Sequence, residues 1–169
     1  YSALHSLVSM PISLYKETHL STLTALIDAV MNARDTSYAT RRCIQKLAHR
    51  FICAFARTPE SPFFAFSLQC LQKLAGQAGV LDFPRLDRLL PKGTEHSILK
   101  ALMPFLAHMQ KRQYTQQIIQ LSKRLGKRAH GLVAIDKLLE ETIFTAEKED
   151  AMACMTLWLQ DPITRDARV

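Results

Sequence analysis

The sequence predicts an all-α fold, and two observations lead to this prediction. Apolar residues recur at spacings of three and four in several separate segments, which is the pattern of helices that bury one face. Only five glycines and seven prolines interrupt the 169 residues, which favours long helices over many short strands joined by tight turns. We therefore expect about eight or nine helices and no strand.

Four of these helices are expected in the first half of the chain. They cover residues 2–9, from 18 or 21 to about 34, from 37 to before 59, and from 61 to 76 or 79. Ser37 and Ser61 are predicted N-caps, because a serine hydroxyl can accept a hydrogen bond from an N–H of the first turn. Pro62 suits the first helical position, where its missing N–H has no cost.

The second half begins with a short helix from residue 82 to before residue 91. Thr94 is expected to cap the next helix, in which Pro104 predicts a kink or an earlier break. Apolar spacing then predicts helices around residues 114–125 and 132–139. In a last helix, we expect a buried stripe of four side chains, Met152, Met155, Trp158 and Leu159.

The short links between these helices predict antiparallel helical hairpins in one domain over residues 1–162. Residues 163–169 are expected to form a frayed tail. A short irregular solenoid is an alternative arrangement of the same hairpins, although the sequence contains no residue-level repeat.

The most amphipathic predicted helix presents one apolar face and one basic face. Tyr114, Ile118, Leu121 and Leu125 fall within an arc of about 60° and predict the buried face. The opposite face contains no carboxylate and is the main predicted binding surface. It consists of Arg112, Gln116, Gln120, Lys123, Arg124, Lys127 and Arg128.

The net charge of +7 is concentrated in the middle of the chain. A second basic stretch without acids spans residues 41–57, and its candidate binding residues are Arg41, Arg42, Lys46 and Arg50. The chain turns acidic from Asp136 onward. This asymmetry indicates an anionic partner, an acidic neighbouring protein or internal charge pairing.

Residues 117–136 resemble a helix-turn-helix. Ser122 supplies a small residue in the first helix, Gly126 supplies the turn, and Leu132 and Ile135 supply apolar positions on the second helix. The segment departs from the motif at Lys127, where an apolar residue normally packs, and at Gly131, Asp136, Glu140 and Glu141 on the reading helix. A plain helical hairpin explains the same residues.

Three phenylalanines lie close together in the fourth predicted helix, namely Phe63, Phe64 and Phe66. They are expected to anchor neighbouring helices to one another. An exposed apolar patch that binds a partner is the alternative interpretation.

The sequence contains no convincing catalytic, cofactor or metal site. Ser97 and Lys100 match the SxxK pattern of serine acyl-enzymes, but the other elements of that site are missing. The six histidines are scattered, and none pairs with another at helical spacing. We therefore expect no enzyme activity, no cofactor and no small-molecule substrate.

Cellular location is predicted from the cysteines and the hydropathy. Cys43, Cys53, Cys70 and Cys154 form no CxxC pair and suit reduced thiols in an intracellular protein, cytoplasmic or nuclear. No apolar run approaches the length of a membrane span, so no membrane insertion is expected.

Together these features predict a non-catalytic helical domain for protein–protein interaction or scaffolding, as a subunit of a larger complex. The alternative is a nucleic-acid-binding domain, which would use residues 117–136 and the basic stretches 41–57 and 100–128.

Overall fold

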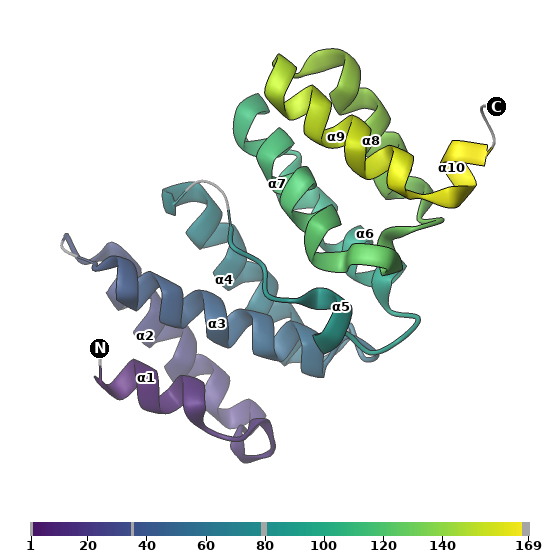
Figure 1. The fold of residues 1–169 in the computed structure, drawn as a ribbon. Coiled ribbons are helices and arrows are strands. Elements are labelled where there is room, and N and C mark those ends of the chain that lie inside the picture. The colour runs from purple at the N-terminus through teal and green to yellow at the C-terminus, as the bar shows by residue number, and fades with distance from the viewer. Residues whose placement is uncertain (1, 35, 79–80, 167–169) are drawn as a thin grey trace. The chain divides into compact units, whose positions relative to one another are not determined.

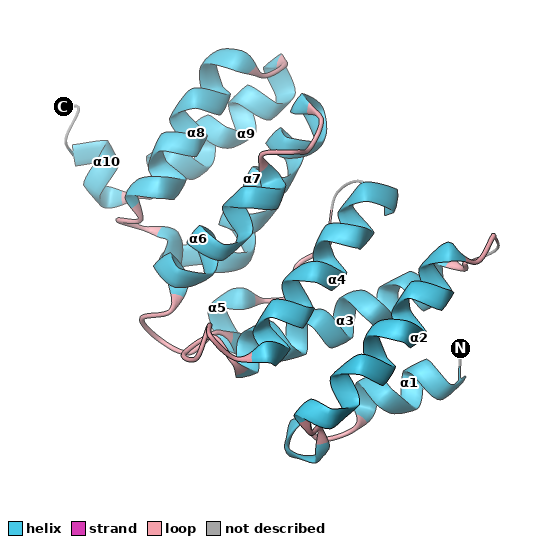
Figure 2. Ribbon diagram, turned by 180° about the vertical axis from the view of Figure 1, so that it is seen from behind, coloured by secondary structure: helices cyan, strands magenta, loops and turns pink. Residues whose placement is uncertain are grey.

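The computed structural model describes residues 2–34, 36–78 and 81–166 of the chain. Every regular element in these ranges is a helix, and Figure 2 shows them joined by loops without a strand. The predicted all-α class is therefore confirmed. Eight of the α-helices described are at least eight residues long, and two more are short, which agrees with the expected number.

The chain forms two compact units, Tyr1–Leu81 and Asp82–Val169. The single domain over residues 1–162 and the solenoid arrangement stay predictions, because both concern how the units combine.

In the first unit, α3 (Tyr38–Ala54) packs against both α1 (Ser2–Ser9) and α4 (Pro62–Ala78) (Figure 1). The helix α2 (Leu20–Asn32) packs against α4 and is preceded by two short 3-10 helices, η1 (Ile12–Leu14) and η2 (Glu17–His19). The helix starts follow the predicted capping signals. The Ser37 hydroxyl accepts a hydrogen bond from the Thr40 N–H, and α4 begins at Pro62.

An aromatic cluster forms the core of this unit. Phe51 on α3 is fully buried, and its ring contacts those of Tyr15, Phe55, Phe63 and Phe66 at centroid distances of 4.8, 6.3, 5.3 and 6.1 Å. Phe63, Phe64 and Phe66 are all buried. The interpretation of these three as an exposed partner patch is therefore wrong, and the rings of Phe63 and Phe66 pack α4 against Phe51 of α3.

The second unit contains α5 (Leu86–Leu89), α6 (Glu95–Leu106), α7 (Lys111–Leu125) and the 3-10 helix η3 (Gly126–Ala129). The chain continues through α8 (Val133–Thr145), α9 (Lys148–Gln160) and α10 (Pro162–Asp166). The helices α8 and α9 form a tight hairpin, and α7 packs against both (Figure 1).

Two expected details of the elements differ from the structure, and two others reach beyond the described residues. Pro104 lies inside α6, which continues to Leu106, so the expected break before the proline is wrong and a kink at the proline stays a prediction. The helix α4 runs past Gly76 to Ala78, which lies within the expected end at residue 76 or 79, and Gly79 is outside the described residues. The segment after Pro162 starts with a helical turn, because Asp161 accepts a hydrogen bond from the Ile163 N–H at 2.9 Å. Residues 167–169 of the predicted tail are outside the described ranges.

The four cysteines are thiols with unequal access to solvent, which predicts unequal reactivity. Burial raises the pKa of Cys70 to about 12 and that of Cys154 to about 11, and Cys43 is buried, whereas Cys53 is half-buried. A thiol-specific reagent at pH 8 should therefore modify Cys53 first, and the other three only as the protein unfolds. Mass spectrometry of timed samples measures this order. Early labelling of Cys70 or Cys154 would contradict the packing around them.

Candidate functional site

The helix α7 was the strongest candidate from sequence, and its apolar stripe is confirmed. Ile118, Leu121 and Leu125 are buried and Tyr114 is half-buried. However, Thr115, Gln117, Ile119 and Ser122 are also buried, so α7 is covered over a much wider arc than its apolar residues indicate. Less of its polar face is left for a partner.

The central part of the predicted basic face is occupied by residues that precede α5. The Gln120 amide oxygen accepts a hydrogen bond from the Phe83 N–H at 3.2 Å, and its nitrogen donates to the Asp82 carboxylate at 3.2 Å. Arg124 forms an ion pair with the same carboxylate at 2.9 Å. Gln120 and Arg124 therefore bind a neighbouring segment of this unit, which corrects their assignment to an open binding face.

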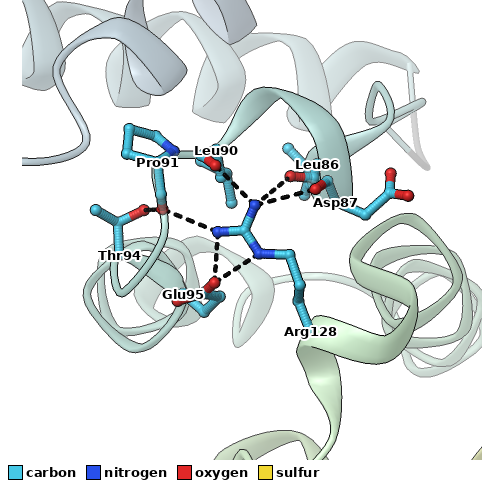
Figure 3. Close-up of polar contacts among 7 residues, drawn as sticks. All are labelled: Leu86, Asp87, Leu90, Pro91, Thr94, Glu95 and Arg128. Atoms are coloured by element: carbon cyan, nitrogen blue, oxygen red, sulfur yellow. Dashed lines mark hydrogen bonds and ion pairs between the residues drawn. The ribbon is translucent and has the colours of Figure 1, made fainter.

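The assignment of Arg128 to the binding face is also corrected. Its guanidinium is the centre of a polar network that joins three segments (Figure 3). It donates to the carbonyl oxygens of Leu90 at 2.7 Å, Pro91 at 2.8 Å and Asp87 at 3.1 Å, with a longer bond to Leu86 at 3.3 Å. Its Nε donates to the Glu95 carboxylate at 2.6 Å. Arg128 thus joins η3 to the carboxyl end of α5 and to the first residue of α6.

The Glu95 carboxylate in this network is ionised more readily than usual. Burial raises its pKa, but hydrogen bonds from the backbone N–H groups of Glu95 and Gly93 and from Arg128 outweigh burial and leave the pKa lowered. Both partners are mostly buried, since 19% of the Arg128 side chain and 15% of the Glu95 side chain are exposed. Arg128 is therefore a structural residue of this unit.

Four of the seven predicted face residues remain exposed, namely Arg112, Gln116, Lys123 and Lys127. In the second basic stretch, Arg42 and Lys46 are exposed and Arg41 is half-buried. Arg50 donates hydrogen bonds to the carbonyl oxygens of Val8 and, at 2.9 Å, Met10 at the end of α1. Arginine in that position satisfies carbonyls that have no partner within the helix, so Arg50 holds α1 on α3.

The predicted helix-turn-helix has the expected small residue and turn glycine but a different geometry. Ser122 is buried, and Gly126 has a φ of +55°, which favours glycine. However, α7 and α8 are separated by residues 126–132, which include the 3-10 helix η3. That link is about twice as long as the three- to four-residue turn of the motif, so the hairpin interpretation fits better.

The helix α9 presents an apolar surface that the sequence analysis assigned to the core. Trp158 and Cys154 form its buried side. Met152, Met155 and Leu159 instead have exposed fractions of 57%, 40% and 47%, so their prediction as buried residues is wrong. Their spacing of three and four places them within an arc of about 60°, as one stripe. We call these three residues the α9 stripe.

The spacing alone could not identify which side of α9 is buried. Cys154 and Trp158 are also at helical spacing, four residues apart, so they define a second apolar side of α9. It is this side, with the large indole ring, that is buried. The signal that was available is the run of acids at the start of α9, Glu147, Glu149 and Asp150, which indicates a helix with substantial contact to water.

A cavity of about 430 Å³ lies within this unit between the end of α7, η3, α8 and the end of α9. Its lining includes Lys123, Lys127, Asp136 and Asp161 together with apolar side chains such as Leu139. Burial and the nearby Asp161 raise the pKa of Asp136, against a smaller lowering by His130. The lysines and aspartates balance one another, so the cavity does not select an anionic or a cationic ligand.

Metal binding and membrane insertion concern two further properties of the described ranges. Residues 2–34, 36–78 and 81–166 contain no group of three or more histidine, cysteine, aspartate or glutamate side chains placed to hold a metal ion. Among the helices that the structure describes, none has the length and apolar character needed to cross a membrane.

Comparison with known proteins identifies no relative of this chain. No family model matches it, and no curated protein or solved structure matches it at a significant level.

Proposed function

We propose that this chain is a non-catalytic protein-interaction domain that docks a partner protein through the α9 stripe. The observation that supports this most is the exposure of three large apolar side chains in one row on a helix whose other side is in the core. Apolar side chains exposed singly are normal on protein surfaces, whereas a contiguous row indicates a binding surface.

The composition of the α9 stripe suits protein recognition. Two of its three members are methionines, whose flexible thioether side chains adapt to the shape of a partner. A stable interface buries about 800 Å² on each partner, more than one stripe provides. We therefore regard the α9 stripe as the apolar centre of a larger interface with a polar rim.

Changing the α9 stripe should remove the partner without unfolding the domain. In Met155→Glu/Leu159→Glu, two exposed apolar side chains become charged, so thermal melting should stay close to wild type while the partner no longer co-purifies. Quantitative mass spectrometry of co-purified proteins measures the loss. Gln72→Glu/Gln116→Glu is the matched control, because it adds the same charge at two exposed glutamines outside α9.

A set of partners that is identical for the wild type and both variants would contradict docking at the α9 stripe. Circular dichroism melting of the three proteins verifies that a lost partner does not reflect an unfolded domain.

Nucleic-acid binding is the second candidate function, and one observation favours it. Arg112, Gln116, Lys123 and Lys127 are exposed along α7 and η3, and no acid occurs between residues 96 and 135. A polyanion bound there would release counterions, so its affinity would fall steeply with salt.

Replacing Arg112, Lys123 and Lys127 with alanine tests this second candidate. The three residues are exposed, so melting should change little. If the face binds nucleic acid, the triple variant should lose affinity for a fluorescent oligonucleotide and show a shallower salt dependence. We expect no specific binding by the wild type, because Gln120, Arg124 and Arg128 are engaged in internal contacts. Tight, salt-sensitive binding that the triple variant loses would favour nucleic acid instead.

A further inference from the structure

We infer that the occupant of the α9 stripe is a basic amphipathic helix of a partner protein. This inference rests on the proposed function and adds the chemistry of the partner. It combines the geometry of the stripe with the charge of the hairpin that presents it.

The geometry of the stripe matches another helix. Met152, Met155 and Leu159 follow a three-four spacing, which is the spacing at which apolar side chains interlock between two packed helices. The same anchors recur where an amphipathic helix binds an apolar surface. An extended strand is a poorer match, because α9 offers no row of unpaired backbone groups for it to bond.

The charge of the α8–α9 hairpin indicates that the partner is positively charged. Residues 133–160, which span α8 and α9, contain six acids and two basic residues in a chain with a net charge of +7, and three of the acids lie at the start of α9 just before Met152, namely Glu147, Glu149 and Asp150. Glu141, Glu147 and Glu149 are exposed, and no ion pair holds them within the described part of the chain. Lysine or arginine beside the apolar residues of a partner helix would complement these carboxylates.

The same charge disfavours the other occupants of an apolar helix face. In a parallel pair of identical chains joined through α9, the exposed carboxylates of Glu147 and Glu149 would lie against their own copies and repel. An anionic membrane surface would repel the hairpin in the same way. An acidic partner helix would also be repelled by these carboxylates, so a basic helix is the occupant that they favour.

Two synthetic helical peptides test the inference with the full chain. Both have the same leucine stripe, and their remaining positions are lysine in one and glutamate in the other. Fluorescence anisotropy measures the affinity of each for the wild type, for Met155→Gln/Leu159→Gln and for the matched control Thr156→Gln/Gln160→Ala. All substitutions are neutral and lie at exposed positions of α9.

The wild type and the control should bind the lysine peptide at least about tenfold more tightly than the glutamate peptide. Met155→Gln/Leu159→Gln should weaken lysine-peptide binding by about tenfold or more, because it removes two apolar contacts. In Glu147→Gln/Glu149→Gln, binding of the lysine peptide should weaken and depend less on salt, because two of the complementary charges are gone.

Three outcomes would overturn the inference, and they separate it from the proposed function. Preference for the glutamate peptide that still depends on Met155 and Leu159 would leave docking at the α9 stripe intact but show that the partner is not basic. Peptide affinity that is unchanged in Met155→Gln/Leu159→Gln would overturn the inference and also contradict docking at the stripe. A concentration-dependent dimer in sedimentation, lost in Met155→Gln/Leu159→Gln, would assign the stripe to a second copy of the chain.

Discussion

Phe51→Ala should destabilise the first unit by about 3–5 kcal/mol, because it removes a fully buried ring from the centre of the aromatic cluster. Four other rings lie around Phe51, and each loses a contact when that ring is removed. The segments that supply these rings cannot collapse fully into the space, so a cavity remains. Denaturant unfolding monitored by circular dichroism measures the loss.

The matched control for this prediction is Tyr38→Ala. Tyr38 is an aromatic residue at the start of the same helix, and 77% of it is exposed. Its removal should change stability by less than about 0.5 kcal/mol. Equal effects of the two substitutions would show that the aromatic cluster is not the core of this unit.

Arg128→Met should cost the second unit about 3–5 kcal/mol at pH 7, although sequence analysis placed Arg128 on a binding face. The methionine keeps the apolar stem but removes every hydrogen bond to the α5 carbonyls and leaves the mostly buried Glu95 carboxylate without its ion-pair partner. Lys127→Met is the control, because Lys127 is the exposed neighbour of Arg128. It should change stability by less than about 0.5 kcal/mol.

The loss of unfolding free energy caused by Arg128→Met should also become smaller at acidic pH. Because the pKa of Glu95 is lowered in the folded state, its ionisation stabilises the fold above the ordinary value of 4.5, and this contribution is lost as the pH falls through the lowered pKa. The difference in unfolding free energy between wild type and Arg128→Met should therefore shrink below pH 4.5 without vanishing, since the bonds to the carbonyl oxygens do not titrate. A pH-independent difference would contradict the ion pair.

The all-α fold followed from the sequence because helix signals are local. The Ser37 cap, the Pro62 start and the apolar spacing around Phe51 each depend on residues within one or two turns, and each was found where it was expected. The break expected before Pro104 does not occur, because the helix continues past the proline for two more residues, and a kink at Pro104 stays a prediction.

The candidate site was harder to predict because it depends on contacts between distant segments. Asp82 lies 42 residues from Arg124, and Leu90 lies 38 residues from Arg128, so neither contact is visible in the spacing of charges along α7. The spacing of residues is also insufficient for α9, which has two apolar stripes of similar spacing, only one of which is buried. Only the packing of α9 against α7 and α8 decides which stripe is buried.

Photo-crosslinking from position 155 tests most directly whether the α9 stripe is the docking surface. A photoreactive phenylalanine analogue replaces Met155 in one variant and the exposed Gln116 of α7 in another, in cells that express the chain. We predict a discrete protein adduct at position 155 whose crosslinked peptide is a basic amphipathic helix, and none at position 116. A nucleic-acid adduct at position 116 with no protein adduct at position 155 would contradict docking through α9.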